Sequence, residues 1–195
     1  MKRLIAVAGT ILPVLALAET GSWTIDSNHT DSTFAVKHLV ISTVRGHFGK
    51  TTGSLKIDEA DFTRSSVEAQ VDVSTIDTRV PNRDTHLRSP DFFDVAKYPT
   101  LTFRSTRVER KGPDHLAVTG DLTMRGTTRP VTFDVTYTPV VKGPAGEERR
   151  GFTATARIDR RDFGLRWAKA VDQAPIVGDE VSIEIDAEAV KDRAK

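Results

Sequence analysis

Residues 83–99, with the sequence RDTHLRSPDFFDVAKYP, carry several side chains that could take part in binding or catalysis. Arg83, His86 and Arg88 could together hold a pyrophosphate or a quinone head group, because guanidinium groups form paired hydrogen bonds with such acceptors. The same side chains could instead pair with the nearby carboxylates of Asp84, Asp91 and Asp94 and fasten this segment to the fold. We favour the fastening role and keep head-group contact as the alternative.

The histidines at positions 29, 38 and 47 are spaced by nine residues, which matches no zinc-binding signature. His38 shares strand parity with apolar Phe34 and Val36, so it is either a hydrogen-bonded structural histidine or a contact for the polar end of a ligand. No nucleophile elbow, zinc-protease motif or glycine-rich phosphate loop occurs in the sequence. We therefore predict no catalytic residues, no metal site and no cofactor.

The N-terminus has the features of a secretory signal peptide. Lys2 and Arg3 precede a mostly apolar stretch over residues 4–17, and Ala16-Leu17-Ala18 forms a small-residue cleavage site. The apolar stretch is too short for a membrane-spanning helix. We expect cleavage after Ala18, export to the periplasm, no stable membrane insertion, and a single mature domain over residues 19–195.

The composition narrows the range of functions. The chain has no cysteine, which excludes thiol nucleophiles, thiol redox chemistry and thiolate metal sites. Without residues 1–18, the chain keeps 26 cationic and 27 acidic side chains, a formal net charge of −1. Because the two signs are interspersed, no basic surface for nucleic acid is expected.

Most of the chain alternates apolar and polar residues with a period of two, which is typical of strands with one buried face. The alternation is strong in residues 66–73, 116–124, 131–138, 152–158 and 181–189, and weaker in 23–25, 34–38, 44–48, 55–57 and 101–105. Short turn signals between them favour antiparallel neighbours. We predict an all-β, antiparallel fold that buries this face either by stacking two sheets or by closing one sheet into a barrel of about eight strands.

A short helical segment is expected near residues 82–97. Asn82 can cap a helix over residues 83–88, and the run 89–91 (Ser-Pro-Asp) is a second helix-start signal. Phe92 and Phe93 would then point in different directions, one into the barrel and the other outward or toward a ligand.

Small residues recur on the apolar face of the strands. They could leave room for a ligand inside the barrel. They could equally mark places where strands approach closely. The residues are Ala69, Gly120, Ala154, Ala156, Ala187 and Ala189.

The chain resembles the YceI-like family from about Trp23 to Val190. Four stretches carry the resemblance, namely WTIDSNHTDSTFAVKHLVISTVRGHFGKTTGSL, STIDTRVPNRDTHLRSPDFFDVAKYPTLTFRST, VTGDLTMRGTTRPVTFDV and GFTATARIDRRDFGL. The resemblance implies an exported lipocalin-like barrel whose hydrophobic lumen holds one extended isoprenoid chain, without an agreed catalytic chemistry.

From strand parity and this resemblance we predict the residues that contact a ligand. They are Phe34, Val36, His38, Phe48, Leu55, Val71, Phe92, Phe93, Leu101, Phe103, Leu122, Phe133, Val135, Phe152 and Ile183. Arg83, His86 and Arg88 are candidates for head-group contact.

The leading hypothesis is a carrier, storage or scavenging protein for a polyprenyl lipid or an isoprenoid quinone. Two alternatives stay open: a lipid-modifying enzyme that uses His38 or His86, and a ligand-free structural or stress-response barrel. The sequence also leaves a homodimer open.

The residues 160–162 (Arg-Arg-Asp) are expected to form a solvated strand end, followed by Phe163, Leu165 and Trp167 as an apolar cap.

Overall fold

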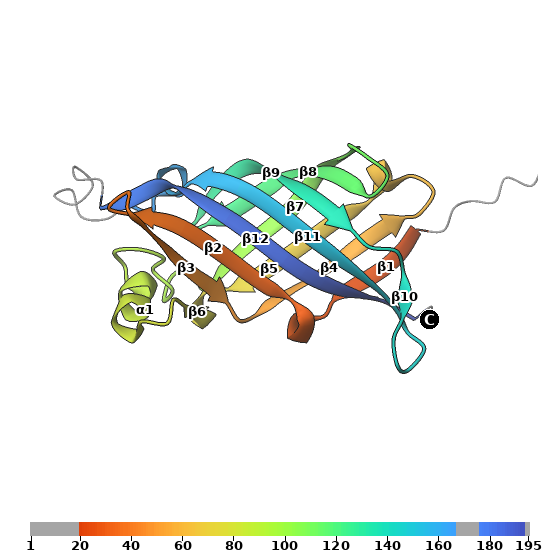
Figure 1. Cartoon of the computed structure of the whole chain (residues 1–195), viewed down its shortest axis with the longest axis horizontal. Helices are drawn as coiled ribbons and strands as arrows, with labels where there is room; N and C mark the ends of the chain where they lie inside the picture. Colours follow the sequence, from red (N-terminus) through yellow and green to blue (C-terminus); the bar gives the residue numbers. More distant parts are fainter. Residues whose placement is uncertain (1–19, 167–175, 194–195) are drawn as a thin grey trace, which may run out of the picture.

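The protein is described by a computed structural model that covers residues 20–166 and 176–193. The expected signal peptide, residues 1–18, and Trp167 lie outside this part of the chain. Antiparallel strands dominate it (Figure 1). They are β1 (Thr20–Ile25), β2 (Asp31–His38), β3 (Ser42–Phe48), β4 (Thr51–Asp58), β5 (Ser66–Asp72), β6 (Ile76–Asp77), β7 (Thr100–Arg110), β8 (His115–Met124), β9 (Thr127–Tyr137), β10 (Val141–Lys142), β11 (Glu148–Asp159) and β12 (Val177–Lys191).

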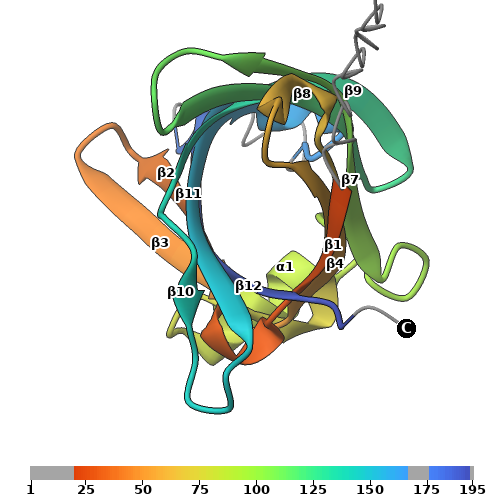
Figure 2. The ribbon, with the colours of Figure 1, turned by 90° about the vertical axis from the view of Figure 1, so that its right-hand side faces the viewer.

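Eight of these strands close into a barrel in the order β11–β9–β8–β7–β5–β4–β1–β12, and pairing of β11 with β12 completes the ring. The prediction of an antiparallel barrel of about eight strands is confirmed. Strands β2, β3 and β6 continue the sheet beyond β12. Figure 2 looks along the barrel and shows β2 and β3 outside the ring.

The period-two alternation explains which face of each strand is buried. Along β8, Leu116, Val118, Gly120, Leu122 and Met124 are buried, and the residues that alternate with them are more exposed. A period of two places alternate side chains on opposite faces of a sheet, so one face fills the barrel and the other meets water. All ten predicted strands are present; the two-residue strands β6 and β10 were not predicted.

The helical prediction is correct in type but not in its bounds. The helix α1 spans Pro81–Arg88, with proline at its start and Val80 rather than Asn82 at the N-cap position. Residues 89–98 form a series of turns, in which Asp94 N donates to Ser89 O and Tyr98 N donates to Asp94 O. Proline at the first helical position loses no hydrogen bond, which explains the earlier start. We call residues 81–99 the cover segment.

The remaining helical elements are short 3-10 turns that begin after aspartates. The side chains of Asp26, Asp61, Asp72 and Asp159 each accept a hydrogen bond from the backbone N–H two residues ahead. Such caps satisfy donors that a short turn leaves unpaired. The four turns are η1 (Ser27–His29), η2 (Phe62–Arg64), η3 (Val73–Thr75) and η4 (Arg160–Phe163).

Aromatic rings and a buried arginine fill the end of the barrel opposite α1, which we call the plug end. Arg150 is 6% exposed, and its guanidinium carbon lies 5.9 Å from the Trp23 ring centroid and 5.4 Å from those of Phe62 and Tyr137. Arg150 also forms an ion pair with Glu59, with an N–O distance of 3.1 Å. Cations over ring faces are favourable, so these groups seal this end.

Candidate ligand-binding cavity

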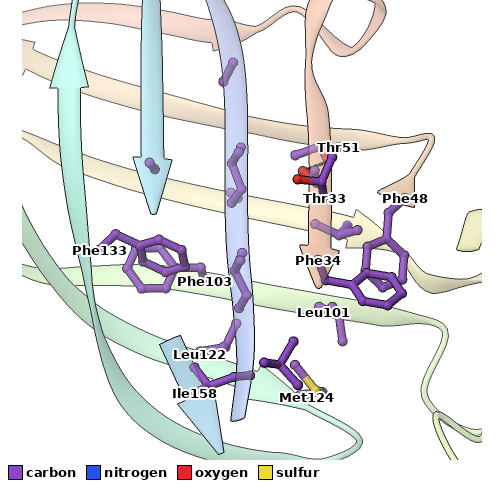
Figure 3. Close-up of a pocket in the computed structure, with 18 of the residues that line it drawn as sticks. Thr33, Phe34, Phe48, Thr51, Leu101, Phe103, Leu122, Met124, Phe133 and Ile158 are labelled. Carbon is purple, nitrogen blue, oxygen red and sulfur yellow. Dashed lines mark hydrogen bonds between the residues drawn. The ribbon is translucent and has the colours of Figure 1, made fainter. Parts of the chain in front are cut away.

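An apolar cavity of about 410 Å³ lies within the barrel (Figure 3). Its volume falls in the range of about 300–1,000 Å³ that is typical of small-molecule sites. All fifteen predicted ligand contacts line it: Phe34, Val36, His38, Phe48, Leu55, Val71, Phe92, Phe93, Leu101, Phe103, Leu122, Phe133, Val135, Phe152 and Ile183. Their contact with a ligand itself remains a prediction.

Aromatic side chains form two groups along the cavity. Phe103 and Phe133 meet edge to face, with ring centroids 5.1 Å apart. Phe34 lies 5.6 Å from Phe48, and Phe48 lies 6.0 Å from Phe93 of the cover segment. Figure 3 shows Phe103 and Phe133 on one part of the lining and Phe34 and Phe48 on another. Both groups offer apolar surface without directional hydrogen bonds, which suits a flexible hydrocarbon chain.

The small residues on the inner face have mixed roles. Ala69, Ala154, Ala187 and Ala189 line the cavity and leave space there. At Gly120, by contrast, an added Cβ atom would lie 2.4 Å from Arg104 O and 2.5 Å from the Phe103 ring, so this position permits close packing. Both readings of the small residues therefore apply, each at different positions.

Phe92 and Phe93 were expected to point in different directions, one into the barrel and the other outward or toward a ligand, and the outward placement is not observed. Both are buried, at 8% and 9% exposure, and both line the cavity. Residues 89–98 are turns rather than a helix, so adjacent side chains are not separated by a helical rotation. Both rings of the cover segment therefore contribute to the apolar lining.

Polar side chains in the lining include one fully buried pair. The hydroxyls of Ser32 and Thr51, which are 4% and 2% exposed, form a 2.8 Å hydrogen bond with each other. Because each hydroxyl has a partner, the pair adds little cost to burial beside an apolar ligand.

Cationic and imidazole groups line the cavity toward the cover segment. They are Lys37 and His38 at the end of β2, Arg83 and His86 of α1, and Arg160 of η4. A ligand with an apolar chain and a polar or anionic end could place that end here, because these groups can donate hydrogen bonds.

The three predicted head-group residues separate in the structure. Arg83 and His86 line the cavity, whereas Arg88 does not. Arg88 donates through Nε to Ser74 O at 3.0 Å and through Nη2 to Ile76 O at 2.7 Å. Its guanidinium therefore holds the cover segment to η3 and β6, which is a fastening role as favoured from the sequence.

Arg83 and Asp84 also fasten the cover segment, through Thr78. Arg83 Nε donates to Thr78 Oγ1 at 2.7 Å, and Nη2 donates to Thr78 O at 2.8 Å. Asp84, which is 6% exposed, accepts hydrogen bonds from Thr78 N at 2.9 Å and Thr78 Oγ1 at 2.5 Å. Near the cavity, His86 Nε2 lies 3.3 Å from the Asp91 carboxylate. Of the expected carboxylate pairs, His86–Asp91 is present, whereas Arg83 and Asp84 fasten the segment through Thr78.

Sequence reasoning missed Arg160, which was assigned to a solvated strand end. Arg160 is only 5% exposed and donates to the backbone oxygens of Leu165 at 2.6 Å and Gly178 at 3.0 Å. It also pairs with Asp179 at 2.9 Å. Neighbouring Arg161, at 45% side-chain exposure, fits the expected solvated position. These acceptors lie up to 19 positions along the chain, and no local pattern points to them.

The apolar residues after η4 partly match the expected cap. Phe163 and Leu165 are buried, and Leu165 lines the cavity. These residues therefore close part of the cavity wall.

A cluster of Asp26, His29 and Glu188 has the ligand types of a metal site. Arg149 Nη1 lies 3.0 Å from Asp26 Oδ2 and also pairs with Glu188. Arg149 therefore already supplies a positive charge to both carboxylates. Hydrogen bonds from His29 and Arg149 hold the pKa of Asp26 below its usual value.

A comparison with protein families matches residues 23–189 to the YceI-like domain. The chain therefore belongs to the YceI-like family, and the resemblance inferred from the sequence is confirmed. It is 36% identical to a UPF0312 protein of Vibrio parahaemolyticus over 97% of this chain and 98% of that protein. It is also 36% identical to a UPF0312 protein of Vibrio cholerae, over 85% and 90% of the two chains.

Solved structures show the same barrel. BcnA of Burkholderia cenocepacia matches with a TM-score of 0.74 and 27% identity, over 84% of this chain and 98% of that one. A YceI protein of Campylobacter jejuni matches with a TM-score of 0.69 and 30% identity, over 80% and 90%. A polyisoprenoid-binding domain of Saccharophagus degradans shares the fold, with a TM-score of 0.65 at 14% identity over 89% and 100%. Within residues 20–166 and 176–193, no helix is long and apolar enough to cross a bilayer.

Proposed function

We propose that this protein binds an isoprenoid chain, as a polyprenyl lipid or an isoprenoid quinone, and serves as a carrier, store or scavenger of that lipid after export to the periplasm. The observation that carries the proposal is the apolar cavity of about 410 Å³ inside the barrel. The polyisoprenoid-binding domain with the same fold supports it. The signal-peptide pattern of residues 1–18 supports export.

Burial of hydrocarbon supplies the affinity in this proposal. Apolar surface removed from water contributes roughly 25 cal/mol per Å², so a branched chain needs few polar contacts to bind. The polar end of the ligand would lie toward the cover segment, near His38, Arg83 and His86. No bond is made or broken in the proposed cycle.

Mass spectrometry of an organic-solvent extract of the purified protein tests the proposal directly. We expect a co-purifying isoprenoid, and uptake of an added isoprenoid quinone by protein stripped of lipid. If neither is found, the proposed function is wrong.

Matched tryptophan variants locate the site. Leu122→Trp and Phe133→Trp should block uptake, because both residues line the cavity and their side chains are 7% and 6% exposed. Thr132→Trp is the control, since Thr132 neighbours Phe133 and faces outward. Uptake that survives in all three variants would place the ligand elsewhere.

A further inference from the structure

Three consecutive large apolar residues project from the turn between β2 and β3. Leu39, Val40 and Ile41 are 46%, 70% and 84% exposed. Ordinary surfaces carry scattered apolar residues, whereas three adjacent ones form a small continuous patch. We call residues 39–41 the hairpin tip.

The backbone of the hairpin tip makes this choice of residues unexpected. Leu39 and Val40 have φ values of 49° and 63°, both in the left-handed region, and Ile41 N donates to His38 O at 3.2 Å. Hairpin turns with two left-handed central residues usually contain Asn-Gly, and a β-branched residue such as Val40 is strained there. The apolar side chains are thus not the ones that the turn itself requires.

The hairpin tip extends directly from the cavity lining. Val36, Lys37 and His38 before it and Val44 after it line the cavity. Figure 1 shows the tip at the end of the barrel that also carries α1, away from the C-terminal end. A surface that the tip contacted would therefore lie next to this end of the cavity.

The charged side chains near the tip of the β2–β3 hairpin are cationic, and Asp179 and Glu180 on the adjoining strand β12 are paired with arginines outside the hairpin. Residues 32–57 contain four cationic side chains and no aspartate or glutamate. Two of these cations, Lys37 and Arg45, are exposed on the strands that carry the tip. Basic residues beside an apolar patch favour contact with anionic lipid.

We propose that the hairpin tip inserts reversibly into the surface of an anionic lipid bilayer and brings the end of the cavity against it. This proposal rests on the proposed function, because a carrier of a membrane lipid must reach the bilayer. The patch is too small for a stable protein–protein interface, which buries on the order of 1,200 Å² or more. Insertion into a bilayer requires only a few apolar side chains.

The test is co-sedimentation of the full-length mature chain with vesicles of phosphatidylglycerol and phosphatidylcholine. The variant Leu39→Asn/Val40→Gly/Ile41→Ser should bind about tenfold more weakly, because three apolar side chains no longer enter the bilayer. Asn-Gly suits the turn, so the variant should melt at the same or a higher temperature than the parent protein. This second measurement shows that weaker binding does not come from a lost fold.

The control variant is Val140→Ser/Val141→Ser. Val140 and Val141 are 36% and 57% exposed near the plug end, and their replacement should leave vesicle binding unchanged. Equal binding by the parent protein and the tip variant, or an equal loss in the control variant, would overturn the proposal.

Transfer assays separate this proposal from the proposed function. The tip variant should take up a soluble short-chain quinone as the parent protein does, but should extract a long-chain quinone from vesicles more slowly. Failure of both proteins to take up the soluble quinone would refute the proposed function. Normal uptake of the soluble quinone with equal extraction rates would refute membrane docking alone.

Discussion

Asp84 provides a sharp test of how the cover segment is held on the barrel. Its buried carboxylate accepts hydrogen bonds from the N–H and hydroxyl of Thr78, which is itself only 4% exposed. Asp84→Ala removes the acceptor and leaves both donors of Thr78 without it. The perturbation therefore acts on one contact between α1 and Thr78, which directly follows β6.

The size of the effect follows from these two contacts. A buried donor left unsatisfied costs about 1–3 kcal/mol, and alanine returns about 0.5 kcal/mol through its higher helix propensity. We expect Asp84→Ala to lower the free energy of unfolding by about 2–4 kcal/mol. That is a large part of the roughly 5–15 kcal/mol by which domains are stable.

Urea unfolding measures the loss, and amide hydrogen exchange at Thr78 shows where it occurs. Thr85→Ala is the control on the same helix: its hydroxyl is exposed and donates only to Pro81 O, so we expect a change below about 0.5 kcal/mol. If Asp84→Ala unfolds like the parent protein and Thr78 stays protected, the reasoning about this anchor is refuted.

Three further predictions concern buried and paired arginines. Arg160→Met should cost about 2–4 kcal/mol in urea unfolding, because the carbonyls of Leu165 and Gly178 lose their donor; an unchanged midpoint would contradict this. Arg150→Met should change stability by less than about 1 kcal/mol, because Nε of Arg150 has no hydrogen-bond acceptor among the described residues and its half-exposed partner Glu59 can rehydrate; a loss above about 3 kcal/mol would show that the ring contacts dominate. Arg149→Met should lower the melting temperature more at pH 7 than at pH 3. Hydrogen bonds from Arg149 lower the pKa of Glu147, and hydrogen bonds from His29 and Arg149 lower the pKa of Asp26. Both ionised carboxylates therefore stabilise the fold above their ordinary pKa values, and this stabilisation is lost as the pH falls. An equal loss of melting temperature at both pH values would exclude this cause.

The alternation of residues predicted the inner face of the barrel well. Strand parity places Phe103, Leu122 and Phe133 on the inner face, and all three line the cavity. Parity succeeds because the side-chain period of a strand is two, whatever its neighbours are. The cover segment was less predictable, because residues 89–98 contain helix-start residues but pair as turns.

Parity also offered a signal that was not used. Arg150 shares the inward parity of Phe152 on β11, which places its side chain inside the plug end. An arginine on an inward face is unusual and points to paired aromatic or carboxylate partners. The identity of those partners, Trp23, Phe62 and Tyr137, could not be read from the same strand.

The sequence by itself determined that this protein is an antiparallel barrel with one apolar face, and it determined which side chains lie on that face. Only the tertiary structure decided how the ring closes, through β11 and β12, and which polar groups are buried at its ends. The reason is that alternation is a local property of one strand. The rings around Arg150, and the groups that hold Asp84, Arg88 and Arg160, come together only in the folded chain.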